Sequence, residues 1–418
     1  MNEKRKSMKM LYNVRSDDPY APTNPMTPLP LQLPSSITHQ PQLNHSHFSL
    51  SSLLSSLLFI SSPSLSLAHK NIMVYFEGEK EHKDLIPGLP NEIAELCLLH
   101  VPYPYQALSR SVSSTWNRAI THPSFIFSKK TLSHPNLFVL AFHSQTGKLQ
   151  WQALDPSSAR WFLLPQMPSP EEDDACPAPL ACAALPRQGE LFVVNGRETL
   201  AYRAATNQWS VTGGPGRREL VAAVGVEGRI VAVGRGGTGV YDPESDTWQE
   251  GSELGGELER YEVVAAAGRV YVTEGWWWPF MFRPRGWVYE VERDTWQEMR
   301  VGMREGWSGV GVAVGERVFM IAEYGDSPVK VYDEEHDTWY PVGGGRFPRE
   351  VMKRPFCATG LDDRIYVASR GLNVAIGIVE TVQDVKGCSA DVSVTWQVVE
   401  APRAFREFSP CSCQVLYA

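Results

Sequence analysis

The sequence predicts a mainly β fold, in which a six-bladed β-propeller follows a small all-α module. Three observations support this prediction. A tryptophan that follows a short polar turn recurs six times after residue 136, at intervals of 39 to 57 residues. Each interval holds several short strand-like runs, and a stretch with helical periodicity precedes the first copy. A period of this length suits a four-stranded propeller blade.

Residues 1–72 differ in composition from the rest of the chain. They are rich in Ser, Pro, Leu, Asn and His and show no sustained helical or strand period. The run 47–67 is interrupted by serine throughout, whereas a membrane-spanning helix needs roughly 20 mostly apolar residues. We expect a disordered or spurious leader, with Met73 as the true start, and no membrane association. An organelle transit peptide is the alternative.

Residues 84–130 are expected to form the helical module. An extended apolar entry at 85–90 leads to Asn91, which can cap a first helix, and Pro102 and Pro104 end that helix. The i, i+3, i+4, i+7 spacing predicts its apolar face. This face comprises Ile93, Leu96, Cys97 and His100.

Two more short helices are expected in this module. One runs through residues 107–112, and the next begins at Ser113 or Ser114, contains Trp116 and stops at Pro123. Helices this short do not stand alone in water. We therefore expect the module to bury its apolar face against a partner or a neighbouring domain.

From residue 137 onward the chain repeats one strand-rich unit. The unit opens with a strand of small residues, as at 221–226 and 309–314, and a β-branched or aromatic strand follows, as at 229–233 and 317–321. A third strand, a tight polar turn and a fourth strand with the tryptophan complete it. Small side chains fit the crowded inner strands near the propeller axis. The tryptophan is expected to fill the wider gap between blades, where its burial is worth roughly 2–4 kcal/mol.

The count of blades depends on the two ends of the repeat region, residues 137–418. The first unit lacks an inner strand, and the C-terminal run 409–416 has the pattern of a spare one. If the C-terminus completes the first blade, six blades close into a ring without open sheet edges.

Composition argues against several function classes. The formal net charge is -8, whereas phosphate binding needs a basic surface, so nucleic acid is not expected as the main partner. Seven irregularly spaced cysteines without a C-x-x-C pair favour neither a disulfide framework nor a zinc site. A reducing compartment follows as the expected location, which is the cytoplasm or the nucleus.

Both parts together resemble the plant F-box/kelch-repeat proteins over residues 84–418. The resemblance rests on Leu-Ile-Pro-Gly-Leu-Pro-Asn-Glu-Ile-Ala at 85–94, Val-Pro-Tyr at 101–103, Val-Ser-Ser-Thr-Trp at 112–116 and the tryptophan-marked repeat, which identifies the propeller as kelch-type. In that family the F-box docks on a Skp-family adaptor, which links it to a cullin and a ubiquitin-conjugating enzyme. The resemblance implies these adaptor-facing or supporting residues: Leu89, Pro90, Ile93, Leu96, Leu99, Val101 and Trp116. The alternative is that Leu96 and Trp116 belong to the module's own interior.

We expect no catalytic residues, no metal and no cofactor. After residue 136 the chain has two histidines, His143 and His336, and the blade scheme puts them on opposite faces. They could therefore neither share a metal nor serve one nucleophile. Hydrolysis by paired carboxylates stays open, although most acidic residues lie in the turns before the tryptophans. There, an Asp is expected to close a hairpin through its own backbone bonds.

The loops of one propeller face are expected to hold a target protein. The most distinctive insertion, residues 275–287, contains three consecutive tryptophans, which cannot all point into a core because side chains of a strand alternate between faces. Aromatic residues with arginine are typical of interface hot spots. The candidate target-binding residues here are Trp276, Trp277, Trp278, Phe280, Phe282, Arg283 and Arg285. The alternative is that the loop covers the exposed edge of the propeller or packs on the leader.

Arginines recur in other loops of the same face. The candidates are Arg218, Arg260, Arg304, Arg349 and Arg354, with Arg217 and Arg403 in equivalent places. They predict a basic rim for an acidic or polar partner surface. The alternative is that they bond to loop carbonyls around the channel.

The resulting hypothesis is a non-catalytic substrate-recognition subunit of an SCF-type ubiquitin ligase. Its propeller would hold a target protein, for which a metabolic enzyme is one candidate, for ubiquitylation and proteasomal degradation. A non-degradative interaction scaffold is the alternative from another class, and a metal-dependent or sugar-processing propeller enzyme is a third.

Overall fold

The computed structural model describes most of the chain after residue 83. The described residues are 84–132, 135–168, 180–216, 219–275, 283–322, 328–382 and 391–418. The expected leader, residues 1–72, and Met73 lie outside them.

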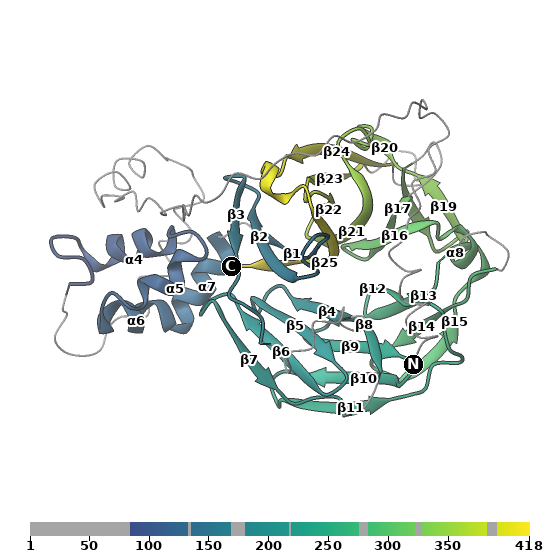
Figure 1. Ribbon diagram of the computed structural model, residues 1–418, viewed down its shortest axis with the longest axis horizontal. Coiled ribbons are helices and arrows are strands. Elements are labelled where there is room, and N and C mark those ends of the chain that lie inside the picture. The colour runs from purple at the N-terminus through teal and green to yellow at the C-terminus, as the bar shows by residue number, and fades with distance from the viewer. Residues whose placement is uncertain are drawn as a thin grey trace, which may run out of the picture. The chain divides into compact units, whose positions relative to one another are not determined.

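Helices α4 to α7 form the N-terminal helical module (Figure 1). They are α4 (Asn91–Leu99), α5 (Tyr105–Ser109), α6 (Ser114–Thr121) and α7 (Pro123–Leu132). Leu98, Leu99, Ile120 and Phe125 form its buried core. The sequence does not predict α7, since Pro123 indicates a stop. Proline suits the first turn of a helix equally well, and α7 begins there. None of the helices in the described ranges is long and apolar enough to cross a membrane.

Two predicted helix caps have different outcomes. Ser113 is the N-cap of α6, and its hydroxyl accepts a hydrogen bond of 3.1 Å from the Trp116 N–H, as predicted. The predicted cap of α4 is wrong, because Pro90 precedes this helix without any side-chain bond. The Asn91 side chain instead accepts a hydrogen bond of 2.9 Å from the Leu85 N–H, which holds the entry segment against the helix.

The apolar face predicted for α4 is only partly covered within the module, with Leu96 and Cys97 half-buried. Ala94, Leu98 and Leu99 are the buried residues of this helix, whereas Ile93 is 43% exposed and His100 is exposed. Apolar residues occur on more than one side of α4, so periodicity alone does not tell which stripe meets α6 and α7. The Ile93 side stays open to solvent.

Six sheets follow, and their strands in order from the inside outward define the blades (Figure 1). Blade 1 has β25 (Phe408–Tyr417), β1 (Pro135–His143), β2 (Leu149–Asp155) and β3 (Arg160–Leu163). Blade 2 has β4 (Ala181–Leu185), β5 (Glu190–Asn195), β6 (Glu198–Arg203) and β7 (Gln208–Thr212). Blade 3 has β8 (Leu220–Val226), β9 (Arg229–Gly234), β10 (Gly237–Asp242) and β11 (Thr247–Gly251).

The second half of the ring repeats this arrangement. Blade 4 has β12 (Glu262–Ala266), β13 (Arg269–Thr273), β14 (Gly286–Glu290) and β15 (Thr295–Glu298). Blade 5 has β16 (Gly309–Val314), β17 (Arg317–Ala322), β18 (Val329–Asp333) and β19 (Thr338–Pro341). Blade 6 has β21 (Lys353–Leu361), β22 (Arg364–Arg370), β23 (Val374–Val382) and β24 (Asp391–Val399), with β20 (Gly343–Gly344) beside β24. Helix α8 (Val301–Gly306) precedes blade 5, and the 3-10 helix η1 (Arg403–Phe405) precedes β25.

The C-terminal strand closes the ring, as predicted. Strand β25 pairs antiparallel with β1 from Pro135↔Tyr417 to His143↔Phe408 and supplies the missing inner strand of blade 1. It also contacts β4 on one side and β21 on the other, and the remaining inner strands contact one another in sequence order. The prediction of a six-bladed propeller closed by the chain's end is therefore confirmed.

Backbone crowding near the axis explains why the inner strands hold small residues. A Cβ added to Gly225 of β8 would lie 2.0 Å from the Ala184 carbonyl oxygen of β4. A Cβ added to Gly360 of β21 would lie 1.9 Å from the Ala313 carbonyl oxygen of β16. Both distances are far shorter than a van der Waals contact, so these neighbouring inner strands approach so closely that only glycine fits there.

The repeated tryptophans join neighbouring blades at the outside. Trp248 of blade 3 donates its indole N–H to the Gly213 carbonyl at 2.9 Å, in the connection that leaves blade 2. Trp296 of blade 4 donates in the same way to the Ser252 carbonyl at 3.0 Å, in the connection that leaves blade 3. Each ring thus fills the gap between two blades, as predicted, and also satisfies a buried donor.

The turn before Trp339 contains two aspartates with different roles, and only the first has the predicted role of closing its own hairpin. Asp333 accepts a hydrogen bond of 2.9 Å from the Glu335 N–H and closes its own turn. Asp337, four residues later, takes a left-handed φ of +50° and accepts hydrogen bonds from the Tyr332 hydroxyl at 2.7 Å and the Gly302 N–H at 2.8 Å. The second carboxylate therefore bridges two blades rather than only closing a hairpin.

The same bridge recurs at Asp294. Its carboxylate accepts hydrogen bonds from the Ser252 N–H at 2.7 Å and the Tyr289 hydroxyl at 2.6 Å. These bonds, the backbone one first, hold the pKa of Asp294 below its ordinary value. The folded state therefore favours the ionised form more than the unfolded chain does.

We expect the Asp294→Asn substitution to lower the free energy of unfolding at neutral pH by about 0.5–1 kcal/mol, because it removes charge-assisted bonds at an exposed site. The contribution is complete above the ordinary Asp pKa of about 4 and is lost as pH falls through the lower folded pKa. Urea titrations between neutral and acid pH should show the two proteins converging below about pH 4. Glu292→Gln, in the same exposed turn, is the control with no such convergence. A difference that stays constant down to acid pH would contradict the bridge.

Candidate docking surfaces

The structure separates the seven expected adaptor-binding residues by exposure. Pro90 and Ile93 are exposed, whereas Leu99 is 3% exposed and belongs to the core of the helical module. The remaining four are half-buried: Leu89, Leu96, Val101 and Trp116. Only the first two present a free surface, and the others are placed to support it.

Trp116 has a partner within the module. Its indole N–H donates a hydrogen bond of 2.6 Å to the Leu85 carbonyl, and its ring packs with Leu96 against the module core. Leu85 is also held by Asn91. The contacts favour the interior reading of Trp116, in which the ring fixes the entry segment in front of α4.

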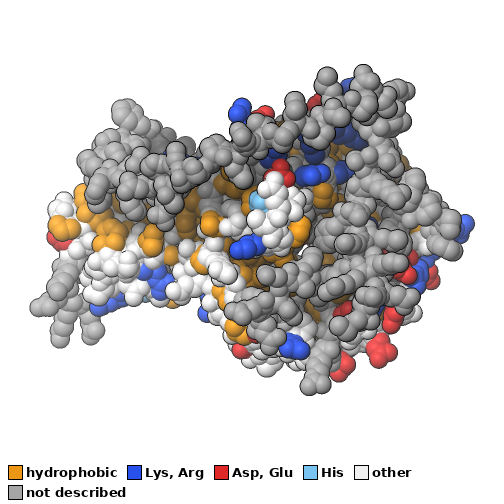
Figure 2. Space-filling view, in the orientation of Figure 1, with side chains coloured by type: hydrophobic (Ala, Val, Ile, Leu, Met, Phe, Trp, Pro, Cys, Tyr) orange, Lys and Arg blue, Asp and Glu red, His pale blue; other side chains and the backbone are white. Residues whose placement is uncertain are grey.

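Three exposed apolar side chains of the same module are not among the expected adaptor-binding residues. Tyr105, Leu108 and Val112 are 48%, 63% and 62% exposed. Figure 2 shows hydrophobic side chains, in orange, at the surface of this module. The i, i+4 spacing of Leu108 and Val112 is the sequence signal for a shared face, but it does not tell whether that face is inside or outside.

Tyr103 anchors the helical module to the propeller. It lies between α4 and α5, is 5% exposed and packs in one cluster with Phe138 of β1, Tyr202 of β6 and Leu416 of β25. Its ring meets Phe138 edge-on with 5.5 Å between ring centroids. Its hydroxyl bonds to the Tyr202 hydroxyl, which donates to Asn207 Oδ1 at 2.7 Å. Burial raises the pKa of Tyr103, so the phenol stays protonated.

Lys129 of α7 completes this junction. Its ammonium group donates hydrogen bonds of 2.9 Å to the carbonyl of Leu99, the last residue of α4, and to that of Val101 just beyond the helix. Burial lowers the pKa of Lys129 to about 8, and Asp155 of blade 1 opposes this change. The carbonyls at the end of α4, which lack helical partners, are thereby satisfied.

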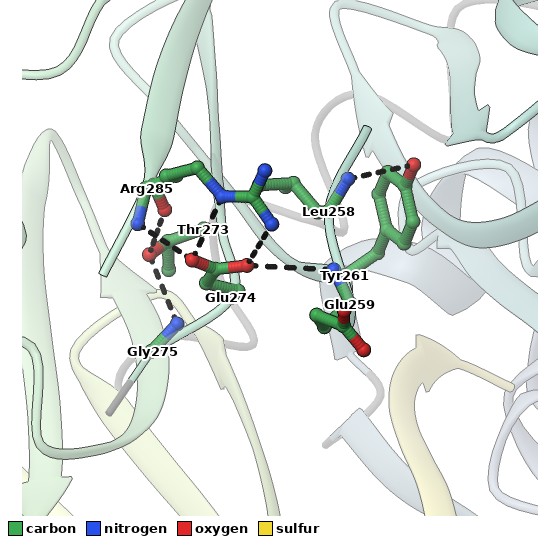
Figure 3. A network of polar contacts seen from close by, with 7 residues as sticks. All are labelled: Leu258, Glu259, Tyr261, Thr273, Glu274, Gly275 and Arg285. Atoms are coloured by element: carbon green, nitrogen blue, oxygen red, sulfur yellow. Dashed lines mark hydrogen bonds and ion pairs between the residues drawn. The ribbon is translucent and has the colours of Figure 1, made fainter. Parts of the chain in front are cut away.

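The base of the aromatic insertion is a tight polar network (Figure 3). Arg285 bonds through its guanidinium to both oxygens of Glu274, at 3.1 Å and 3.0 Å, and its N–H also donates to Glu274 at 2.9 Å. Thr273 donates to the Arg285 carbonyl at 3.0 Å. The Glu259 N–H reaches Glu274 from the connection that precedes β12. Arg285 therefore clamps the ends of β13 and β14 together, which is a structural role.

The other predicted target-binding residues have mixed placements. Arg283 is highly exposed and forms a 3.4 Å ion pair with Glu305, whereas Arg304 is largely buried and paired with Glu298. Arg260, Arg349 and Arg354 are exposed, as is Arg403. The residues that lie outside the described ranges are Trp276, Trp277, Trp278, Phe280, Phe282, Arg217 and Arg218.

Possible chemical sites were sought over the described ranges. No group of three or more His, Cys, Asp and Glu side chains there could hold a metal ion. Burial raises the pKa of Cys182 to about 12, the opposite of what a reactive thiolate needs. A cleft of about 130 Å³ between blades 4 and 5 is lined in part by Arg269 and Glu334, which form a two-point ion pair at 2.7 Å and 2.9 Å.

Comparison with known proteins agrees with this architecture. The helical module matches the F-box domain over residues 86–128. The chain is 47% identical to the F-box protein AFR of Arabidopsis thaliana over 357 residues, which cover 82% of this chain and 95% of that protein. It is 32% identical to the F-box/kelch-repeat protein At1g30090 of the same plant over 355 residues, which cover 80% of this chain and 87% of that protein.

The chain belongs to the F-box/kelch-repeat family. Proteins of this family act in general as substrate receptors of SCF-type ubiquitin ligases, and they are adaptor subunits rather than enzymes. An F-box implies binding to a Skp-family adaptor. In this chain the F-box comprises α4 to α7 of the helical module, and the kelch propeller is the ring of six blades.

We expect the Tyr103→Ala substitution to lower the free energy of unfolding by about 3–5 kcal/mol, as for other buried aromatic residues, because it empties the cluster between the F-box and the propeller. Tyr103→Phe should cost only about 0.5–1.5 kcal/mol, since Tyr202 keeps its bond to Asn207. Denaturant titration of the full chain measures both. Tyr105→Ala, at a half-exposed ring nearby, is the control. Equal losses for Tyr103→Ala and Tyr105→Ala would contradict the anchoring role.

Proposed function

We propose that this chain is the target receptor of an SCF-type ubiquitin ligase that also contains a cullin. The F-box docks on a Skp-family adaptor, and the loops of the propeller hold a protein for ubiquitylation and proteasomal degradation. The receptor supplies proximity, while the chemistry takes place on other subunits. A cytoplasmic or nuclear location is part of this proposal.

One observation supports the adaptor interface most directly. The F-box exposes the apolar side chains of Ile93, Leu108 and Val112. Its buried core is formed by other residues, namely Leu98, Leu99, Ile120 and Phe125. Several large apolar side chains left exposed on one small module indicate that it docks on a partner. Burying each against a partner would contribute roughly 1.5–3 kcal/mol.

We propose that the target binds on the propeller face formed by the connections between blades. Strand direction alternates within a blade, so the connections into the inner strands share a face with those between second and third strands. The aromatic insertion belongs to this face, and the Glu274–Arg285 clamp fixes its base. The identity of the target is not encoded in these residues; a metabolic enzyme is the class suggested by analogy alone.

We expect the double substitution Ile93→Asp with Leu108→Asp to weaken binding to a purified Skp-family adaptor by at least about 100-fold, because two apolar contacts are lost and two charges are desolvated. Isothermal titration calorimetry measures this. The matched control is Leu163→Asp with Val211→Asp, since both side chains are 57% exposed but lie on the propeller. Thermal melts verify that both variants are folded. Unchanged adaptor binding by the F-box variant, or an equal loss in the control, would contradict the interface.

The same variants separate a receptor from a non-degradative scaffold. A receptor should co-precipitate the cullin, and its bound partners should accumulate when the proteasome is inhibited. The F-box variant should keep those partners but lose the cullin. If the protein is a scaffold, the unchanged protein should co-precipitate the same partners as the F-box variant, and neither should co-precipitate the cullin.

We expect replacement of Trp276, Trp277 and Trp278 by alanine to remove a subset of neighbours in proximity labelling, because aromatic residues contribute much of the binding energy at protein interfaces. Tyr340→Ala is the control, since this ring is 45% exposed on the outer strand β19. An unchanged neighbour set for the tryptophan variant would exclude this loop from target binding.

A further inference from the structure

Basic side chains gather where the chain enters the inner strands β21 and β25. They come from the connection before β21, the end of β22 and the connection before β25. Figure 2 shows blue side chains over the region where Figure 1 places β21 to β24. We call this set the basic platform. Its members, all exposed, are Arg346, Arg349, Lys353, Arg354, Arg370, Arg403 and Arg406.

Hydrogen bonds hold the three segments of the platform side by side. The Asn373 side chain donates to the Val351 carbonyl at 3.3 Å and accepts from the Ala401 N–H at 2.9 Å, so it joins the two connections. The Gly371 N–H donates to the Phe408 carbonyl at 2.8 Å. A Cβ at Gly371 would lie only 3.9 Å from the Cα of Arg406. Charges that are far apart in the sequence therefore share one surface.

Buried apolar residues fix each segment from below. Phe347 and Met352 anchor the first connection, and both are at most 5% exposed. Leu372 is fully buried beside the second segment. Phe405 of η1 packs edge-on against Phe408 with 5.7 Å between ring centroids. The platform is thus ordered before any partner arrives, which lowers the entropic cost of binding.

The charges of the platform are poorly compensated within the chain. Lys353 and Arg370 stand directly opposite each other in the β21–β22 pair, an arrangement that destabilises a sheet. The three segments carry three carboxylates, Glu350, Glu400 and Glu407, beside the cations of the platform, and Glu407 accepts a hydrogen bond from Ser144. Within the described ranges, no ion pair involves Lys353 or Arg370, and the same holds for Arg346, Arg349, Arg403 and Arg406.

We propose that the basic platform is the docking site for an acidic segment of the target protein, a stretch rich in Asp and Glu side chains. The proposal rests on the receptor function proposed above and specifies the chemistry of its target. A local arrangement that weakens the fold without a local benefit indicates a functional surface. Complementary charge then steers the encounter and favours one orientation.

Other anions fit this surface less well. The cations are spread over three segments and none is buried, whereas recognition of one phosphate group needs several donors converging on a single point. An extended nucleic acid would reach beyond the platform over a chain whose total net charge is -8. An acidic peptide segment carries carboxylates at intervals along the chain, so it can pair with the separated cations of the basic platform.

Fluorescence anisotropy with the full chain tests the proposal. The probe is a labelled peptide of alternating Asp and Gly residues. The platform variant combines Lys353→Glu, Arg370→Glu and Arg403→Glu. The matched control combines Arg187→Glu, Arg229→Glu and Arg317→Glu, which change the net charge equally at exposed positions beside the turns at the other end of the inner strands. Thermal melts verify that both are folded.

We expect the platform variant to bind the acidic peptide on the order of 30-fold more weakly, from several exposed charge pairs, and the control to change by less than about threefold. Added salt should weaken binding to the unchanged protein. An equal loss in both variants, or no loss in either, overturns the proposal. Tighter binding of a phosphoserine peptide or of single-stranded DNA than of the Asp peptide overturns the assignment to carboxylates.

Adaptor binding distinguishes this inference from the receptor proposal. The platform variant should bind the Skp-family adaptor as the unchanged protein does, because its substitutions lie outside the F-box. If the platform variant and the control variant bind the acidic peptide equally well while the unchanged chain binds the adaptor, only the platform proposal is overturned. Failure of the unchanged chain to bind any Skp-family adaptor overturns the receptor function, whatever the peptide result.

Discussion

The pairing of β25 with β1 is the constraint on which the rest of the structure depends. It joins the chain's last strand to the first strand of the propeller and leaves each inner strand with two neighbours. Leu416 of β25 also lies in the cluster that holds Tyr103, so ring closure and attachment of the F-box share one core. Loss of this pairing would expose a sheet edge on blade 1 and weaken the F-box junction together.

Different interactions hold the blades together near the axis of the ring and at its outside. Near the axis, backbones approach so closely at Gly225 and Gly360 that any side chain is sterically excluded. At the outside, tryptophan rings and bridging carboxylates such as Asp337 connect each blade to the one before it. The inter-blade connections are therefore held at both ends, which makes them suitable carriers of exposed side chains for binding.

The repeat made the propeller predictable from sequence, because six noisy copies of one pattern reinforce each other. Features that occur only once in the chain were harder to predict from the sequence. Apolar residues occur on two sides of α4, so periodicity alone did not single out Ala94, Leu98 and Leu99 as its buried side, and Pro123 marks a helix start as readily as an end. The two carboxylates of the turn before Trp339 look alike in sequence, although Asp337, and not Asp333, accepts bonds from the connection that leaves the preceding blade. The basic platform draws on three separate segments, and only their convergence at Asn373 reveals it.

The order of synthesis gives β25 a further significance. A ribosome releases the F-box helices and the first strands of blade 1 long before residues 408–417, so blade 1 lacks its inner strand until that segment has been made. A chain that stopped before residue 408 would hold the F-box helices without a closed ring.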